Sequence, residues 1–320
     1  MTRLQPSQVT RLAIIGAGVI GGGWAAHFLR MGLDVVAWDP APNAEAKLRD
    51  FIADKWPAMQ RLGLGEGASP SRLTFVPTLP EAVQGVQFVQ ENAPEDLEKK
   101  RKVLADIDAA APLEAVISSS TSGFGMTDMQ VNCQHPERTV VGHPFNPPYL
   151  IPLVETVGGL KTDPAVVDWT HAFYTHFGKY SIKMKKELPG FLGNRLQDAV
   201  WREVLHMVGA GEATVEELDA SIAYGPGLRW ALMGPSLTYH LGGGEGGMRH
   251  LLDHFGPALE QPWTRCPAPK LTDELCDRMV AGCEREANGR TVRELEQERD
   301  DFLIELLALL ERHWGKYGRR

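Results

Sequence analysis

The feature that most constrains how this chain can fold is a run of glycines near its amino terminus. The apolar stretch Arg11–Ile15 leads into Gly16-Ala17-Gly18-Val19-Ile20-Gly21, and the helix-forming stretch Ala25–Arg30 follows. A strand, a GxGxxG turn and a helix in this order form a dinucleotide-binding unit. The first glycine permits a tight turn, the second lets the backbone approach a pyrophosphate, and the third lets helix pack on strand. The predicted cofactor-binding residues of this turn are Gly16, Gly18, Val19, Ile20 and Gly21.

An acidic residue follows this turn at the spacing that a dinucleotide site needs. The second predicted strand, Asp34–Trp38, ends at Asp39, which lies eighteen residues after Gly21. A carboxylate here accepts a hydrogen bond from the ribose 2′-hydroxyl and repels a 2′-phosphate. The sequence therefore predicts that the cofactor is NAD rather than NADP.

Further strands alternate with helices through the first half of the chain. A predicted helix at 43–62 follows the second strand, and the next predicted strands are 73–76, 86–90, 115–118 and 139–141, with a helix at 97–110 between the second and third of these. This alternation predicts a Rossmann-type, doubly wound parallel sheet of the α/β class. The loops at the carboxyl ends of parallel strands share one edge, so Gly16–Gly21, Asp39, Ala93, Ser122 and His143 are expected at one rim.

The pattern changes after Pro189-Gly190, where strands give way to helices. The predicted helices are 192–209, 214–223, 237–255, 272–282 and 291–313, and the glycines at 242–247 are expected to interrupt the third. We therefore expect an NAD-binding domain at residues 1–188 and an all-α carboxyl-terminal domain for substrate binding and dimerisation at 189–320.

The stretch Val140–Val157 combines two ionisable side chains with four prolines. His143 lies near its start and Glu155 twelve positions later, with Pro144, Pro147, Pro148 and Pro152 between them. Proline fixes φ and removes a backbone donor, so a stiff loop is expected. An imidazole held near a carboxylate suits a general base with an orienting partner. From spacing alone, a strand-capping histidine and a solvated glutamate are an equally good reading.

Composition bounds the remaining possibilities. A chain of 320 residues favours two domains, and a net charge of −8 without a long basic run disfavours nucleic-acid or anionic-membrane partners. No run of 18 apolar residues and no cleavage-site pattern occurs, so the cytoplasm is the expected compartment. The cysteines lack zinc-site spacing, so we expect free thiols and no metal site; they are Cys133, Cys266, Cys276 and Cys283.

With these residues in view, the chain resembles the 3-hydroxyacyl-CoA dehydrogenase superfamily over nearly its whole length. The resemblance is carried by GAGVIG, ENAPEDLEKK, the Thr121-Ser122 turn, GHPFNPPYLIPLVE and Pro189-Gly190-Phe191 running into Asn194-Arg195. It implies that His143 is the catalytic base, that Glu155 is its paired carboxylate, and that Ser122 and Asn194 surround the reacting oxygen. It also places Glu95 and Lys100 near the cofactor and implies a homodimer formed through the helical domain.

A narrower resemblance, to the carnitine-oxidising branch of that superfamily, rests on longer strings. These are YGPGLRW from Tyr224, MGP from Met233, LGGGEGGM from Leu241, HFGP from His254 and PWTR from Pro262. It implies L-carnitine as the small-molecule substrate. Hydroxyacyl-CoA enzymes typically carry a lysine-rich helical insertion that meets the CoA phosphates, whereas Lys47–Arg72 has two lysines and three arginines against Asp50, Asp54 and Glu66. The residues thus favour a small substrate.

A trimethylammonium group forms no hydrogen bonds and is recognised by aromatic faces. Four aromatic residues in the loops that carry the resemblance are candidates: Phe145, Trp230, Tyr239 and Phe255. Arg195, Arg229 and Lys186 are candidates for the substrate carboxylate. Without the resemblance, the aromatic residues would be read as core, Ser122 as a turn former and Asn194 as a helix cap.

Three other functions are compatible with parts of the sequence. They are a 3-hydroxyacyl-CoA dehydrogenase, a dehydrogenase of the L-gulonate type that acts on small hydroxy acids, and a catalytically silent, crystallin-like dinucleotide-binding protein. The first lacks its basic insertion here, the second has no use for an aromatic cage, and the third does not need Ser122, His143, Glu155 and Asn194.

Overall fold

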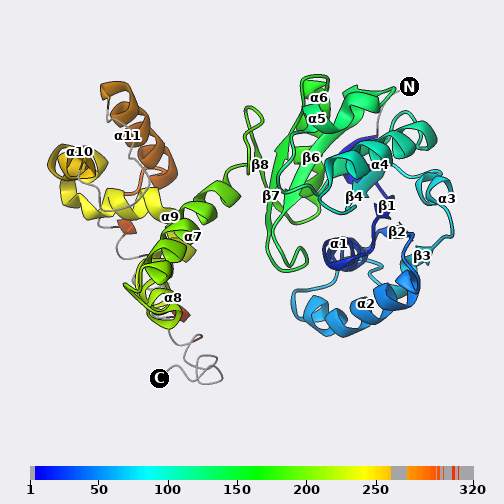
Figure 1. Ribbon diagram of the computed structural model, residues 1–320, viewed down its shortest axis with the longest axis horizontal. Coiled ribbons are helices and arrows are strands. Elements are labelled where there is room, and N and C mark those ends of the chain that lie inside the picture. The colour runs from blue at the N-terminus through cyan, green and yellow to red at the C-terminus, as the bar shows by residue number, and fades with distance from the viewer. Residues whose placement is uncertain are drawn as a thin grey trace. The chain divides into compact units, whose positions relative to one another are not determined.

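A computed structural model describes residues 4–260 and 272–292, together with residues 294, 295, 298, 305, 306 and 309. The chain divides into two compact units, Met1–Leu196 and Gln197–Arg320, and each is described by itself. Figure 1 shows a sheet flanked by helices in the first unit and helices in the second. This is the Rossmann-like α/β domain and the helical carboxyl-terminal domain that the sequence predicts.

The first unit is built on one eight-stranded sheet with the order β3-β2-β1-β4-β5-β6-β7-β8. All neighbours from β3 to β6 are parallel; β7 is antiparallel to β6, and β8 is parallel to β7. The strands are β1 Arg11–Ile15, β2 Asp34–Trp38, β3 Leu73–Phe75, β4 Phe88–Glu91, β5 Val116–Ser119, β6 Thr139–Pro144, β7 Leu153–Val157 and β8 Tyr180–Lys183.

Helices cover both faces of this sheet because successive strand side chains point to opposite sides. Leu12 and Ile14 belong to a core that includes residues of α1, α2 and α6, whereas Ala13 and Ile15 belong to a core that includes residues of α3, α4 and α5. These helices are α1 Val19–Arg30, α2 Ala44–Arg61, α3 Leu79–Val83, α4 Leu97–Ala110, α5 Met126–Met129 and α6 Pro164–His176.

The second unit contains helices and a smaller core. The helices are α8 Val215–Ala223, α9 Pro226–Gly242, α10 Gly247–Phe255 and α11 Asp273–Ala287, and α7 (Gly193–Gly209) begins at the end of the first unit. Buried side chains of Met233, Leu237 and Leu241 pack with Ala287 and Leu295. Some expectations lie wholly or mostly outside the described residues: the predicted helix 291–313, the PWTR string and Cys266.

One expectation about the proline-rich stretch is wrong. His143 lies in β6 and Glu155 in β7, directly opposite each other in antiparallel register, and only residues 145–152 form an irregular connection. A parallel pair needs a crossover of a dozen or more residues. The eight residues of this connection are too few, so β7 returns antiparallel to β6 and brings Glu155 beside His143.

The candidate aromatic residues of the second unit also differ from expectation. Trp230 and Tyr239 lie within α9 and Phe255 is the last residue of α10, so none lies in a loop. The helix starts at Pro226, because proline is favoured in the first helical turn, where its missing N–H costs nothing. It contains a kink at Gly234, whose φ is +70°, just before Pro235.

Candidate active site

The glycine turn leaves room for a dinucleotide above the start of α1. A Cβ on Gly16 would lie 2.8 Å from the Asn92 carbonyl oxygen, and one on Gly21 would lie 1.9 Å from the Gly16 carbonyl oxygen. A Cβ on Gly18 would meet nothing within 4 Å. Two glycines are therefore required by close packing, and Gly18 borders open space at the amino-terminal end of α1, where Val19 and Ile20 begin the helix.

The Asp39 carboxylate lies at the end of β2, beside this turn. Its Oδ2 accepts a hydrogen bond from the Ala17 N–H at 2.7 Å, and its Oδ1 accepts one from the Ala41 N–H at 2.8 Å. An open hollow of about 510 Å³, bordered by Ala41, Asn43 and Phe75, adjoins this strand end. The glycine turn, the carboxylate and the hollow fit the pyrophosphate, ribose and adenine of NAD in that order.

Glu95 holds the Ser122 turn in place. Its Oε1 accepts hydrogen bonds from Thr121 Oγ1 at 2.7 Å, the Ser122 N–H at 3.1 Å and the Gly123 N–H at 2.9 Å. The Asn194 amide nitrogen donates to the Ser122 carbonyl oxygen at 3.1 Å. Ser122 and Asn194, 72 positions apart in the sequence, are thus brought together, and the Ser122 hydroxyl has no hydrogen-bond partner among the described residues.

Lys100 is buried next to the segment from Glu91 to Glu95. Its ammonium donates to Glu91 Oε1 at 3.1 Å and to the Ala93 carbonyl oxygen at 3.0 Å, and it lies 3.6 Å from Glu95 Oε2. Glu91, which sequence reasoning missed, is fully buried and also accepts from the Ala93 N–H at 2.5 Å and from the Ser119 hydroxyl. The ammonium thus holds the Ala93 carbonyl group by a hydrogen bond and the Glu95 carboxylate by an ion pair.

His143 and Glu155 form a buried pair across β6 and β7. His143 Nδ1 lies 2.8 Å from Glu155 Oε2, with 5% and 0% of the two side chains exposed. Glu155 Oε1 accepts from the backbone N–H groups of Leu192 at 2.8 Å and Gly193 at 2.9 Å. Because Nδ1 is committed to Glu155, Nε2 is left to meet a substrate, and it has no hydrogen-bond partner in the part of the chain that is described.

The electrostatics of the pair depend on these hydrogen bonds. Burial, the largest influence, by itself raises the pKa of Glu155. Hydrogen bonds from His143 and from the Gly193 and Leu192 N–H groups outweigh burial and leave the pKa below its ordinary value. Glu155 is therefore a carboxylate at neutral pH and can hold the Nδ1–H tautomer of His143.

Two phenyl rings contact the imidazole. The Phe145 ring centroid lies 4.9 Å from that of His143, and the Phe191 centroid lies 5.1 Å away. Phe191 is 1% exposed and has a φ of +52°, an unusual conformation for a bulky residue. The sequence did not predict this contact of Phe191 with the imidazole, although the preceding Pro189-Gly190 turn is recognisable in the sequence. Gly193 packs closely on the Phe145 ring, because a Cβ there would lie 2.4 Å from Phe145 Cζ and would require the ring to shift.

The remaining predicted substrate residues divide between the two units. Trp230, Tyr239, Phe255 and Arg229 belong to the second unit, where Tyr239 and Phe255 are exposed and Trp230 is half-buried. Lys186 and Arg195 belong to the first unit and are exposed; Arg195 directly follows Asn194 in the first turn of α7. The structure thus places Phe145 beside the His143–Glu155 pair and describes the other three aromatic residues only within their own unit.

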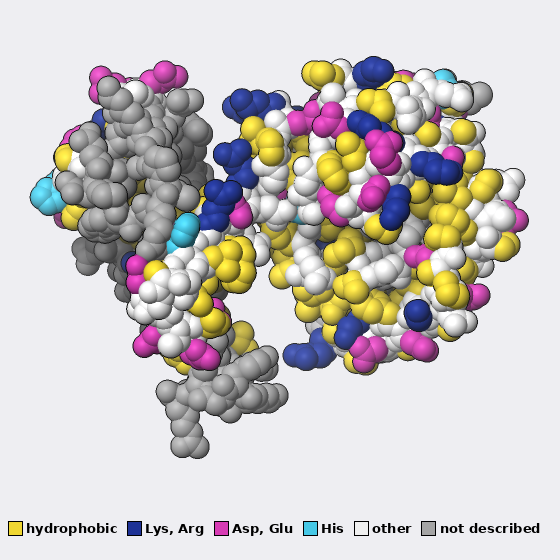
Figure 2. Space-filling view, in the orientation of Figure 1, with side chains coloured by type: hydrophobic (Ala, Val, Ile, Leu, Met, Phe, Trp, Pro, Cys, Tyr) yellow, Lys and Arg dark blue, Asp and Glu magenta, His cyan; other side chains and the backbone are white. Residues whose placement is uncertain are grey.

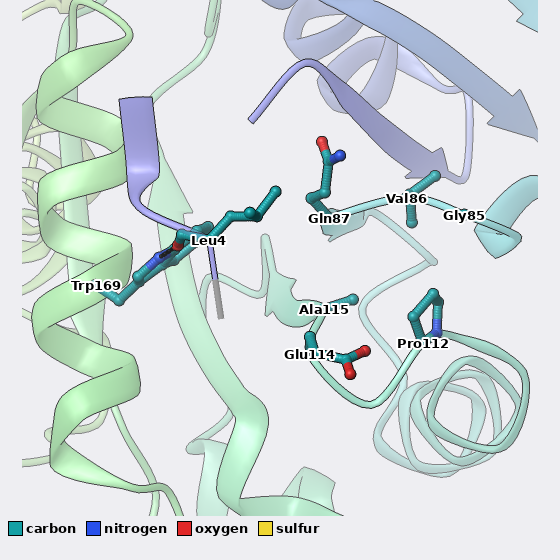
Figure 3. A pocket seen from close by; sticks show the side chains of 8 residues that line it. All are labelled: Leu4, Gly85, Val86, Gln87, Pro112, Glu114, Ala115 and Trp169. Atoms are coloured by element: carbon teal, nitrogen blue, oxygen red, sulfur yellow. Dashed lines mark hydrogen bonds between the residues drawn. The ribbon is translucent and has the colours of Figure 1, made fainter. Parts of the chain in front are cut away.

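The first unit has a second cavity, away from the residues described above. A cavity of about 290 Å³ is lined by Leu4, Trp169 and the residues that precede β4 and β5 (Figure 3). It thus lies at the amino-terminal ends of these strands, whereas His143 lies near the carboxyl end of β6. Figure 2 shows acidic and basic side chains interspersed over the visible face of the first unit. Within the described residues, no cluster of three or more His, Cys, Asp or Glu could hold a metal, and no helix is long and apolar enough to cross a bilayer.

Two protein-family models match consecutive parts of the chain. A model of the NAD-binding domain of 3-hydroxyacyl-CoA dehydrogenase matches residues 11–188, and a model of that enzyme's carboxyl-terminal domain matches residues 190–288. Together they cover most of the chain. The chain therefore belongs to the 3-hydroxyacyl-CoA dehydrogenase family, a class of NAD-dependent oxidoreductases that act on CH–OH groups.

Individual relatives carry narrower names than the family models. L-carnitine dehydrogenase of Streptomyces griseus subsp. griseus is 62% identical over 94% of this chain and 90% of its own length. L-carnitine dehydrogenase of Pseudomonas putida is 48% identical over 98% of this chain and 97% of its own length. Among solved structures, the NAD⁺-dependent 5-formyl-3-hydroxy-2-methylpyridine 4-carboxylic acid 5-dehydrogenase has a TM-score of 0.71 at 27% identity, covering 98% of this chain and 100% of the other.

Proposed function

We propose that this protein oxidises L-carnitine to 3-dehydrocarnitine with NAD⁺. The observation that carries the proposal is the similarity over nearly the whole chain to enzymes named L-carnitine dehydrogenase, at 48% to 62% identity. The glycine turn, Asp39 and the buried His143–Glu155 pair supply the groups that such a reaction needs. NAD⁺, when bound, supplies the acceptor for the hydride that leaves C3 of the substrate.

The chain's own residues have distinct roles in this proposal. His143 Nε2 takes the proton of the C3 hydroxyl, and Glu155 holds the ring tautomer and stabilises the imidazolium. The Ser122 hydroxyl and the Asn194 amide donate hydrogen bonds to the oxygen as negative charge develops, at roughly 2–4 kcal/mol per donor in comparable sites. Their proximity, through the Asn194–Ser122 hydrogen bond, supports this pairing.

The cofactor residues are Gly16, Gly18, Val19, Ile20, Gly21, Asp39, Ala93, Glu95 and Lys100. We propose that the first six contact NAD through the glycine turn and the ribose. Lys100 acts from below, since its ammonium contacts Glu91, Ala93 and Glu95. We also propose a domain boundary at residues 188–189. The chain divides into its two compact units after Leu196, and the first family model ends at residue 188.

The experiment that tests the function is parallel measurement of NADH formation with L-carnitine, D-carnitine, 3-hydroxybutyryl-CoA and L-gulonate. We expect turnover with L-carnitine and at most a small fraction of it with the other three. A preference for the CoA thioester would contradict the proposal. Two basic residues of α2 that could meet the CoA phosphates, Arg49 and Lys55, are paired with Glu45 and Asp54. This pairing disfavours a CoA substrate.

Replacement of Asp39 by serine is expected to weaken NAD use. The variant loses the carboxylate that accepts from the ribose hydroxyls, so KM for NAD⁺ should rise about tenfold or more, and turnover with NADP⁺ should become measurable as the repulsion of its 2′-phosphate is removed. Steady-state kinetics with both cofactors checks this, with Asp54→Ser on the surface of α2 as the control. An unchanged ratio of the two cofactors would exclude Asp39 as the discriminating residue.

We propose that Phe145, with Trp230, Tyr239 and Phe255, binds the trimethylammonium group. Replacing Phe145 or Trp230 by alanine should raise KM for L-carnitine about tenfold, because each aromatic face contributes roughly 0.5–2 kcal/mol, and should leave KM for NAD⁺ nearly unchanged. An equal rise of both constants would count against the aromatic cage. Comparison with a substrate analogue that lacks the quaternary ammonium separates cation binding from general packing.

We also propose that the protein is a cytoplasmic homodimer. The helix α7 has no buried residue, and its apolar side chains at Leu196, Val200, Trp201, Leu205 and Val208 are exposed. Exposed apolar area of this kind is typical of subunit interfaces. Sedimentation of the protein at micromolar concentration tests this: a monomer would contradict it.

A further inference from the structure

The connection between β6 and β7 determines where His143 and Glu155 stand. Residues 145–152 link the two strands and contain Pro147, Pro148 and Pro152, which have no N–H to donate. Within the connection, the N–H groups of Leu150 and Ile151 both donate hydrogen bonds to the Pro147 carbonyl oxygen. The connection therefore depends on donors from elsewhere in the fold for its other buried carbonyl groups.

Lys179 supplies such donors. It lies between α6 and β8, is 6% exposed, and its ammonium donates to the carbonyl oxygens of Pro148 and, at 3.1 Å, of Ile151. Its own backbone N–H donates to the Tyr174 carbonyl oxygen at 2.9 Å, which fixes it on the end of α6. One buried side chain thus joins α6 to two points of the connection, three residues apart.

The same ammonium faces α1, the helix that begins at the glycine turn. Lys179 Nζ lies 5.1 Å from the centroid of the Trp24 ring, and the Trp24 Nε1–H donates to Ser120 Oγ at 3.1 Å. The connection rests directly on α1, because a Cβ on Gly23 would lie 2.8 Å from Pro148 Cδ. Lys179 therefore contacts both the connection and the helix against which that connection packs.

A lysine is an expensive residue to bury at this place. Among the described residues no carboxylate pairs with it. Its ionisable neighbours on α1 are Arg30 and His27, and burial, followed by the charges of Lys179 and Arg30, lowers the pKa of His27 well below its ordinary value. Burial, and then the charge of Arg30, lower the pKa of Lys179 to about 7. Since methionine would fill similar space without a desolvation penalty, the hydrogen bonds to the connection are the gain that offsets this cost.

We propose that Lys179 is a positioning residue for the His143–Glu155 pair. Its ammonium holds the connection between β6 and β7 on α1, so that imidazole, carboxylate and the Phe145 ring keep the arrangement that the reaction requires. This inference rests on the proposed function for its kinetic part and on the observed contacts alone for its structural part.

The test compares Lys179→Met with Lys183→Met, a control on β8 whose lysine is half-exposed and pairs with Asp168. For Lys179→Met we expect kcat to fall between about tenfold and a hundredfold, as small misplacements of reacting groups do. Binding of NADH, followed by fluorescence, should change less than twofold. Amide hydrogen exchange in residues 145–153 should accelerate at least tenfold, and Lys183→Met should change none of these quantities.

The possible outcomes separate a positioning role from a merely structural one. A folded Lys179→Met protein with faster exchange but normal kcat would overturn the proposal, as would one in which both are unchanged. Lys179→Gln retains neutral donors on a shorter side chain and replaces Lys179→Met in the same measurements if that variant does not fold. Kinetics use whichever substrate the wild-type enzyme turns over, so failure with L-carnitine would contradict the proposed function without deciding the role of Lys179.

Discussion

Replacement of His143 by asparagine is expected to reduce kcat with L-carnitine at least about a hundredfold, the lower range for loss of a general base. Asparagine fits the space next to Phe145 and Phe191 and can donate to Glu155, so the fold and NADH binding should be retained. What is lost is the nitrogen that would accept the proton of the substrate hydroxyl.

The measurement is single-turnover NADH formation, which isolates the chemical step from product release. His135→Asn is a matched control, because His135 also lies beside a glutamate, with Nδ1 3.4 Å from Glu137, but on the surface and away from the site. If His143→Asn folded normally and kept more than a tenth of the wild-type turnover, His143 would not be the base.

Replacement of Glu155 by glutamine should reduce kcat by about a hundredfold to ten-thousandfold, the range seen when the partner that fixes a catalytic tautomer is neutralised. The carboxylate accepts from His143 through Oε2 and from the Leu192 and Gly193 N–H groups through Oε1. An amide has only one oxygen. Its NH₂ group must therefore face either the imidazole, which selects the wrong tautomer, or two backbone donors.

Stability at low pH provides an independent readout of the same carboxylate. The pKa of Glu155 is lower in the folded protein than in the unfolded chain, so Glu155 stabilises the fold above the unfolded-state pKa. This contribution is lost as the pH falls through the folded-state pKa. Glu155→Gln should therefore weaken the dependence of the free energy of unfolding on pH in the acidic range, whereas Glu137→Gln should not. An unchanged acid dependence together with normal kcat would contradict both roles of Glu155.

The order of strands, glycine turn and helix in the NAD-binding domain could be predicted almost entirely from the sequence. The glycine turn and Asp39 are separated by one strand, one helix and a second strand, so their arrangement follows from the local geometry of a βαβ unit. The structure adds which glycine faces open space: Gly16 and Gly21 are closely packed, and Gly18 is not. Gly21 packs on Gly16 of the same turn, whereas Gly16 packs on Asn92, which is distant in the sequence, so only part of this steric demand is local.

The region around His143 and Glu155 was only partly predictable. The sequence singled out both residues, but predicted a stiff loop over residues 140–157, where the structure has two antiparallel strands joined by the irregular connection 145–152. Proline content signals the irregular connection well; it does not reveal that both flanks pair with each other and with β5 and β8. Strand pairing depends on partners distant in the sequence, so a segment's own composition determines it poorly.

By itself, the sequence determined the class of fold and the glycine-rich turn between the first strand and the first helix, because these follow from short-range patterns. Only the tertiary structure decided which buried groups hold the candidate site residues: the N–H groups of Leu192 and Gly193 on Glu155, Glu91 beneath Ala93, the Phe191 ring on His143, and Lys179 on the proline-rich connection. Lys179 lies 28 positions from Ile151 and looks like an ordinary lysine before a strand. Its contacts arise from burial and from the carbonyl groups of Pro148 and Ile151, to which no other described residue donates, and these exist only once the chain has folded.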